Sequence, residues 1–300
     1  MLFLNIIAPV FIVISCGWVL ERYFHLDLTP FTTSSLYLFA PALVLSALLK
    51  HPLNSSHALT VLIFMLLYTS AMLLVATIFT RILSITPDSR PAFTLTTVMM
   101  NIGNFGLPLS YFAFGEQGFP VAVLVFVIFN LPLATIAIVI AQGKQAKLTT
   151  AINNSLKIPI MYSVIIALLL NGANIELPLF MTRPLDLIGQ VAVPMMLVVL
   201  GMQISRTRWH LSLKFMSFAS LLRLVIAPAI AWLICQALNI TGLYRDVLIL
   251  QTSTPSAVLP LLYALRFNTR PDLVASTIMV TTVLSAVTLT ILLYILPMLP

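Results

Sequence analysis

Long apolar stretches recur along the whole chain, and they constrain its fold more than any other feature. There are ten of them, and each approaches or exceeds the length of about 20 residues with which a helix crosses a bilayer core. Composition agrees, because 60% of the residues are hydrophobic and 8% are charged, against about 25% charged in ordinary globular proteins. The sequence therefore predicts an all-α polytopic membrane protein.

The apolar stretches predict ten transmembrane helices. We expect them at residues 2–20, 32–49, 58–80, 91–114, 119–141, 156–170, 185–204, 211–236, 244–265 and 273–297. The first stretch is interpreted as a span rather than a cleaved signal peptide, because it lacks a basic segment and further spans follow.

Basic residues between the spans predict the orientation. Eleven of them fall in the odd-numbered connections and three in the even-numbered ones. The eleven are Arg22, Arg81, Arg90, Lys144, Lys147, Lys157, Arg206, Arg208, Lys214, Arg266 and Arg270, and the three are Lys50, Arg183 and Arg245. Since cationic loops are retained in the cytoplasm, we expect both termini outside. The scattered charges form no basic patch, so nucleic acid is not an expected partner.

The spacing of the prolines indicates an internal repeat. Pro9, Pro41, Pro108 and Pro120 precede Pro159, Pro194, Pro260 and Pro271 by 150, 153, 152 and 151 residues, respectively. We therefore expect two five-helix repeats, residues 1–150 and 151–300. Because five is odd, the second repeat would be inverted relative to the first. Inverted repeats are a common construction of secondary transporters, with the binding site where interrupted helices meet at the midplane.

Two stretches carry helix-breaking residues at equivalent places in the repeats. NIGNFGLPL (101–109) lies in the fourth predicted span and QTSTPSAVLPL (251–261) in the ninth. Glycine and proline let a chain leave helical geometry, and a broken membrane helix has to be buried in protein or line a wet cavity. We therefore predict broken, crossing helices 4 and 9 beside a cavity, whose half-helix N-termini suit an anion. The simpler alternative is that these residues only kink two helices.

The predicted substrate-binding residues come mainly from these two stretches. They are Asn101, Gly103, Asn104, Gly106, Pro108, Thr254, Pro255, Ser256 and Pro260, together with Pro41 and Asn130. For Asn130 the alternative is a hydrogen bond to a neighbouring helix near a proline kink. Gln251, Ser253 and Arg223 are candidate coupling-ion or gate residues.

Arg223 is the only cation well inside a predicted span. Placing an arginine near the bilayer centre costs about 2.5–3.5 kcal/mol on insertion scales, so we interpret it as an anion counter-charge or a gate. The alternatives are snorkelling to the cytoplasmic surface and pairing with carbonyls freed near Pro228.

Ionisable residues of the other kinds lie in predicted loops or at span ends. The carboxylates and the histidines His25, His51, His57 and His210 all do so. Such placement offers no proton relay across the membrane and no haem, metal or Ser-His site. We therefore expect neither a cofactor nor an enzyme.

The chain resembles the auxin efflux carrier family over essentially its whole length. The resemblance rests on the two inverted five-helix repeats, the 101–109 motif and the proline-containing second break. This family belongs to a superfamily that includes the bile-acid sodium symporters. The resemblance implies a scaffold of spans 1, 2, 6 and 7 and a transport bundle of spans 3–5 and 8–10. It also implies an organic anion bound at the crossover and moved by an elevator-like shift. Plant members insert a long loop between the halves and carry an asparagine where this chain has Thr254-Pro255-Ser256. The difference suits a smaller carboxylate rather than auxin, as is usual for bacterial members.

The expected function is therefore efflux of a small organic anion such as a mono- or dicarboxylate. An inside-negative potential of about 100 mV favours the exit of one negative charge by about 2.3 kcal/mol, so efflux needs no coupling ion. The alternatives are a sodium-coupled importer of the same fold and a channel-like or sensor protein. Expected partners are the anion, the lipid bilayer and, as an open question, a second copy of the chain.

Overall fold

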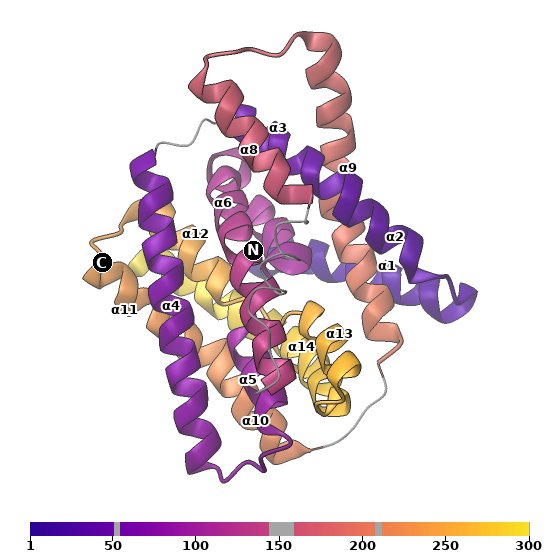
Figure 1. Ribbon diagram of the computed structural model, residues 1–300, viewed down its shortest axis with the longest axis vertical. Coiled ribbons are helices and arrows are strands. Elements are labelled where there is room, and N and C mark those ends of the chain that lie inside the picture. Colours follow the sequence, from indigo (N-terminus) through magenta and orange to yellow (C-terminus); the bar gives the residue numbers. More distant parts are fainter. Residues whose placement is uncertain (51–54, 144–158, 208–211, 300) are drawn as a thin grey trace.

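The computed structural model describes residues 1–50, 55–143, 159–207 and 212–299 (Figure 1). Some sequence predictions lie outside these residues. They are the junction of the two repeats at 150/151, the first residues of the sixth and eighth predicted spans, and Lys144, Lys147, Lys157, Arg208, His51 and His210.

The described chain is helical almost throughout. The elements are η1 (Phe3–Ile7), α1 (Ala8–Phe24), α2 (Leu28–Ser34), η2 (Ser35–Phe39), α3 (Ala40–Lys50), α4 (Ser55–Ile82), α5 (Arg90–Val98), η3 (Ile102–Gly106), α6 (Leu107–Gln142), α8 (Pro159–Gly172), α9 (Leu179–Ser205), α10 (Leu213–Leu221), η5 (Leu222–Ile226), α11 (Ala227–Ala237), α12 (Gly242–Thr252), α13 (Leu259–Phe267), α14 (Pro271–Ile295) and η6 (Leu296–Met298). The last is a 3-10 turn, whereas η1, η2, η3 and η5 are π-helical turns.

Seven helical segments of the described chain are long and apolar enough to cross a membrane. They are Phe3–Phe24, Leu28–Lys50, Ala58–Ile82, Ile102–Gln142, Leu179–Ser205, Leu213–Ala237 and Pro271–Met298. A shorter apolar helix, Pro159–Gly172, lies where the sixth span is predicted. The prediction of an all-helical, multi-pass membrane protein is confirmed. The count of ten helices and their arrangement as inverted repeats stay predictions.

α6 covers the second half of the fourth predicted span and the whole of the fifth. The sequence predicts a connection between them at residues 115–118, and α6 is kinked at this place. Gly115 leaves helical geometry inside α6, with φ 58° and ψ −153°. This conformation is open to glycine because glycine has no Cβ. One residue therefore turns the chain between two arms of α6.

The prolines of the proposed repeat occupy two kinds of place. Pro260 and Pro271 are in the first turns of α13 and α14, where a residue has no helical partner for its N–H and proline costs little. Pro9 and Pro108 instead follow the π-helical turns η1 and η3 inside the continuous helical segments Phe3–Phe24 and Ile102–Gln142. Pro194 lies within α9.

One group of helices packs around α9, on the right of Figure 1. α1 runs along α9, and α3 packs on both α8 and α9. Glycines allow the approach of α1: a Cβ on Gly17 would lie 2.1 Å from the carbonyl oxygen of Val198, and one on Gly201 1.9 Å from that of Ile14. Small residues let membrane helices pack backbone to backbone.

A second group packs around α6 and α14. α12 and α13 contact α6, α10 contacts α14, and α4 contacts α5 and α11. The two groups meet where η3 and α6 contact α9, and where η1 contacts α6 and α14. The breaks that matter for function lie along this boundary.

Candidate functional site

The first break in a helix lies between α5 and η3. Met99 is extended, with φ −84° and ψ 115°, and Asn101 has φ −88° and ψ 62°. The N–H of Gly106 donates to the Asn101 carbonyl at 2.9 Å, so regular turns have already resumed. The interruption therefore precedes Gly103, Gly106 and Pro108, which the sequence analysis held responsible for it.

The second break lies between α12, which ends at Thr252, and α13, which begins at Leu259. Pro255 is in the interrupted segment, and Pro260 starts the next helix. This break is longer than the first and covers the centre of the predicted stretch.

The two breaks pair with each other. The Asn101 N–H donates to the Pro255 carbonyl at 2.8 Å, and the Ala257 N–H donates to the Met99 carbonyl at 2.9 Å. Met100 and Ser256 face each other in this short antiparallel bridge. An unpaired backbone group in hydrocarbon costs several kcal/mol. Each break supplies hydrogen-bond partners to the other, so the two interruptions stabilise one another.

Arg223 holds the chain ends that precede both breaks. Its side chain is fully buried. One terminal nitrogen, Nη1, donates to the carbonyls of Thr97 and Val98, at 3.1 and 3.4 Å. The other, Nη2, donates to the Thr252 carbonyl and to the Tyr68 hydroxyl, the latter at 2.8 Å. The sequence analysis offered two alternatives for Arg223, snorkelling to the cytoplasmic surface and pairing with carbonyls near Pro228. Neither is observed, because the side chain is buried and its carbonyl partners lie at the breaks.

The hydroxyls of the second break bind backbone. Ser256 Oγ donates to the Thr96 carbonyl at 2.6 Å, Thr254 Oγ1 to the Gln251 carbonyl at 2.8 Å, and Ser253 Oγ to the Ile249 carbonyl at 2.5 Å. The Ser256 N–H also donates to Thr281 Oγ1, at 3.2 Å. These residues hold the shape of the break, a task that the sequence analysis did not assign to them.

Gln251 joins the second break to α6. Its Nε2 donates to Ser110 Oγ at 3.0 Å. Its Oε1 is buried without a hydrogen-bond partner among the described residues. Gly106 makes room for this amide, since a Cβ on Gly106 would lie 2.2 Å from Oε1. Gly106 is itself helical, with φ −70° and ψ −41°, so its lack of a side chain serves this close contact rather than a bend.

A cavity of about 330 Å³ borders both breaks. From the predicted set it is lined by Asn101, Gly103, Asn104 and Asn130; Ala40, next to Pro41, also lines it. From the second break it is lined by Ala257, Val258 and Leu259, and from the α9 group by Thr32, Ser35, Met196 and Gln203 among others. The structure thus brings the predicted asparagines together at one cavity between the two groups of helices.

Three buried polar atoms at this cavity lack a partner among the described residues: the donors on Asn101 and Ser35 and the acceptor Oε1 of Gln203. Asn101 is 5% exposed and Ser35 9% exposed. The Asn101 amide nitrogen Nδ2 and the Ser35 hydroxyl make no hydrogen bond to any described residue. Unsatisfied buried polar groups are rare in folded proteins and call for an explanation. Asn130, by contrast, donates to the Phe126 carbonyl of its own helix at 2.7 Å.

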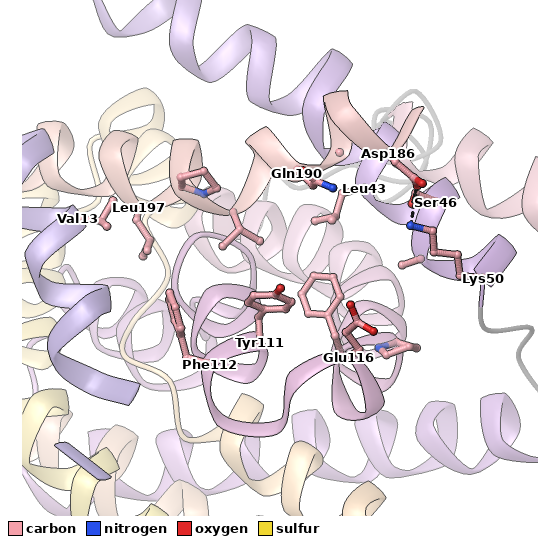
Figure 2. Close-up of a pocket in the computed structure, with 16 residues that line it drawn as sticks. Val13, Leu43, Ser46, Lys50, Tyr111, Phe112, Glu116, Asp186, Gln190 and Leu197 are labelled. Atoms are coloured by element: carbon pink, nitrogen blue, oxygen red, sulfur yellow. Dashed lines mark hydrogen bonds and ion pairs between the residues drawn. The ribbon is translucent and has the colours of Figure 1, made fainter. Parts of the chain in front are cut away.

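A second cavity, of about 540 Å³, lies between α3 and α9 on one side and α6 on the other. Figure 2 shows Tyr111, Phe112 and Glu116 on α6 facing Gln190 of α9. Lys50 pairs with Asp186 at 2.9 Å, and the Ser46 hydroxyl donates to the same carboxylate (Figure 2). Sequence reasoning placed these ionisable residues at span ends and assigned them no role.

Comparisons with known proteins agree with a membrane-spanning carrier. A family model described as membrane transport protein matches residues 2–293. An uncharacterized transporter of Methanocaldococcus jannaschii is 26% identical over 199 residues, which are 64% of this chain and 63% of the relative. Another, of Methanothermobacter thermautotrophicus, is 26% identical over 196 residues, which are 65% of either protein. The match therefore spans less than two thirds of either archaeal relative. Auxin efflux carrier component 1 of Arabidopsis thaliana is 26% identical over 125 residues, which are 41% of this chain and 20% of that protein.

Proposed function

The chain belongs to the membrane transport protein family, and on this premise we propose that it carries a small organic anion, such as a carboxylate, out of the cell. The observation that carries the proposal is the cavity at the two paired breaks. The first turns after the breaks, at Gly103 and Asn104 and at Leu259, line that cavity. Free N–H groups and the positive end of the helix dipole favour an anion at such a place.

The unpaired donors at the cavity support the same ligand chemistry. The Asn101 amide nitrogen and the Ser35 hydroxyl are buried and lack an acceptor among the described residues. A carboxylate offers acceptor lone pairs to both. Among the described residues, those that line the cavity include no charged side chain, and several are apolar, such as Met100 and Phe126. This lining suits one weak anion with a small hydrocarbon part.

The two groups of helices support an elevator-like, alternating-access movement. We assign the group around α9 to the scaffold of spans 1, 2, 6 and 7, and the group around α6 and α14 to the transport bundle of spans 3–5 and 8–10. Both cavities lie along the boundary between these groups. A shift of the bundle along that boundary would carry the breaks from one cavity toward the other. The ten inverted spans of the sequence prediction belong to this proposal.

The predicted orientation assigns a side to each cavity. Ser35 and Gln203, which line the cavity at the breaks, lie at span ends expected in the cytoplasm. Lys50 and Asp186, which line the other, lie at span ends expected outside. The described conformation is then open toward the cytoplasm. Location in a bacterial inner membrane with both termini outside is part of the same proposal.

The test is counterflow in liposomes that contain the purified protein. With a panel of radiolabelled mono- and dicarboxylates, we expect saturable exchange that is unchanged when sodium is replaced by choline, and net exit that increases with an inside-negative potential. Dependence on a sodium gradient would favour the importer instead. Binding or current without saturable counterflow would favour a sensor or channel. Exchange of none of the panel would overturn the anion assignment.

A further inference from the structure

The four acceptors around Arg223 form a set of oxygen ligands at the two breaks. They are the carbonyls of Thr97, Val98 and Thr252 and the hydroxyl of Tyr68. Tyr68 also donates to the Thr252 carbonyl, at 3.0 Å, so the set is linked internally. In transporters built on broken helices, the C-terminal ends of half-helices are where a coupling cation is coordinated. Here that place is filled by a side chain.

We propose that the Arg223 guanidinium is a built-in cation that replaces a soluble coupling ion at the crossover, so that the carrier works without sodium. The inference rests on the proposed function and concerns its energy source. Arginine suits this task because its planar group offers several fixed donors to separate acceptors and keeps its charge.

The charge balance of the crossover supports the proposal. The C-terminal end of a helix carries roughly half a negative charge, and Arg223 bonds to the ends of two helices, α5 and α12. One guanidinium therefore balances two half-charges. Within the described residues, Arg223 forms no ion pair with a carboxylate. A metal cation among the same oxygens would bring a second positive charge to a place that is already neutral.

Arg223 also joins several elements of the same moving part. The residue comes from η5, whereas its acceptors come from α4, α5 and α12. All four elements belong to the proposed bundle. The guanidinium therefore travels with the breaks, as a bound ion would, and keeps them joined when no soluble ion is present.

The experiment compares Arg223→Met with Arg245→Met. Arg245 is a matched control because it is also a buried arginine bonded to backbone carbonyls, but it pairs with Asp246 away from the breaks. Wild-type counterflow should be the same in sodium and in choline. Arg223→Met should reduce it by roughly tenfold to a hundredfold, the range for losing hydrogen bonds to a charged group.

The decisive readout is recovery by a free cation. Millimolar guanidinium or sodium, against choline, should raise the thermal midpoint and the counterflow of Arg223→Met, and should leave Arg245→Met unchanged. A cation effect of equal size in both variants, or none in Arg223→Met, would overturn the proposal. Sodium-dependent counterflow of the wild type would do so as well.

Two further outcomes keep the inference separate from the proposed function. If Arg223→Met does not accumulate in cells, Arg223→Lys is used in its place. Arg223→Lys should transport in choline at a reduced rate. A strict need of this variant for sodium would contradict the built-in cation. The thermal readout needs no substrate. Failure of every carboxylate to exchange would therefore remove the anion proposal, while the cation test would still decide the role of Arg223.

Discussion

Some polar side chains at the breaks form hydrogen bonds within the protein, and others form none to the described residues. Ser256 and Thr254 use their hydroxyls to hold the backbone. The amide nitrogen of Asn101, at the cavity, has no hydrogen-bond partner among the residues that the structure describes. A buried donor without a hydrogen bond costs free energy. Such donors therefore indicate where a ligand makes its contacts.

Replacing Asn101 tests that indication. Asn101→Ala removes the unpaired donor, so we expect the best carboxylate to lose roughly tenfold in affinity, as one net hydrogen bond of about 1–1.5 kcal/mol implies. Asn104→Ala should act in the same direction. The measurement is the rise in thermal midpoint with ligand concentration. Asn5→Ala, which alters an exposed amide, is the control. If the ligand stabilises Asn101→Ala as well as the wild type, the site assignment is wrong.

Replacing Gly106 tests the stability of the fold rather than ligand binding. A methyl group there would displace the Gln251 amide and break its bond to Ser110. We expect Gly106→Ala to lower the free energy of unfolding by about 1–3 kcal/mol. Chemical denaturation in detergent measures this. The double variant with Gln251→Ala should cost less than the sum of the two single changes, because the clash is then gone. Strict additivity would contradict the contact.

At the scale of the helices, two kinds of close approach hold the molecule together. The breaks meet through backbone hydrogen bonds between Met99–Asn101 and Pro255–Ala257. α1 and α9 meet through Gly17 and Gly201, where each backbone touches the other. The first contact depends on polar groups and the second on the lack of side chains, which is the main source of tight packing between membrane helices.

Enlarging Gly201 should separate α1 from α9. The neighbour that a Cβ would meet is the Ile14 carbonyl oxygen, at 1.9 Å, and backbone cannot move aside as a flexible side chain can. We expect Gly201→Ala to lower the free energy of unfolding by about 3 kcal/mol, the upper part of the usual range for overpacking. Gly172→Ala is the matched control, because nothing lies within 4 Å of its Cβ position. Equal thermal midpoints of the two variants would refute the backbone contact.

At the scale of the whole molecule, the boundary between the two groups of helices carries both cavities. One contact across it is the edge-to-face pair of Phe11 on α1 and Phe105 on η3, with ring centroids 6.0 Å apart. An elevator-like movement requires such contacts to slide. A fixed boundary would leave the breaks at one cavity only.

Cross-linking tests this movement. In a background with Cys16→Ala and Cys235→Ala, Phe11→Cys and Phe105→Cys should be joined by a short bismaleimide, and the joined protein should lose counterflow. The control pair is Glu21→Cys and Arg206→Cys, whose parent side chains are paired within the α9 group and line neither cavity. Joining that pair should leave counterflow at the level of its unjoined form. Full activity after joining the first pair would rule out sliding at this boundary.

The sequence alone determined the features that depend on local chemistry. Long apolar runs require helices in a membrane, because every backbone group has to be satisfied there. Proline and glycine predicted that two helices are interrupted near residues 101–109 and 251–261. Asn101, Asn104 and Asn130, which were predicted to bind the substrate, line the cavity at the breaks, and their role in binding stays a prediction. The ten spans and their inverted repeat stay predictions. They rest on the spacing of apolar stretches and prolines along the sequence, which no individual contact in the structure tests.

Only the tertiary structure decided which groups face one another. The break precedes Gly103 because Met99 and Asn101 find partners on the second break. Arg223 binds carbonyls that lie far from it in the chain. Lys50 and Asp186 meet because α3 packs on α9. The local sequence indicates which backbone and side-chain groups need hydrogen-bond partners. Which group becomes the partner depends on how the helices pack, and packing is a property of the assembled molecule.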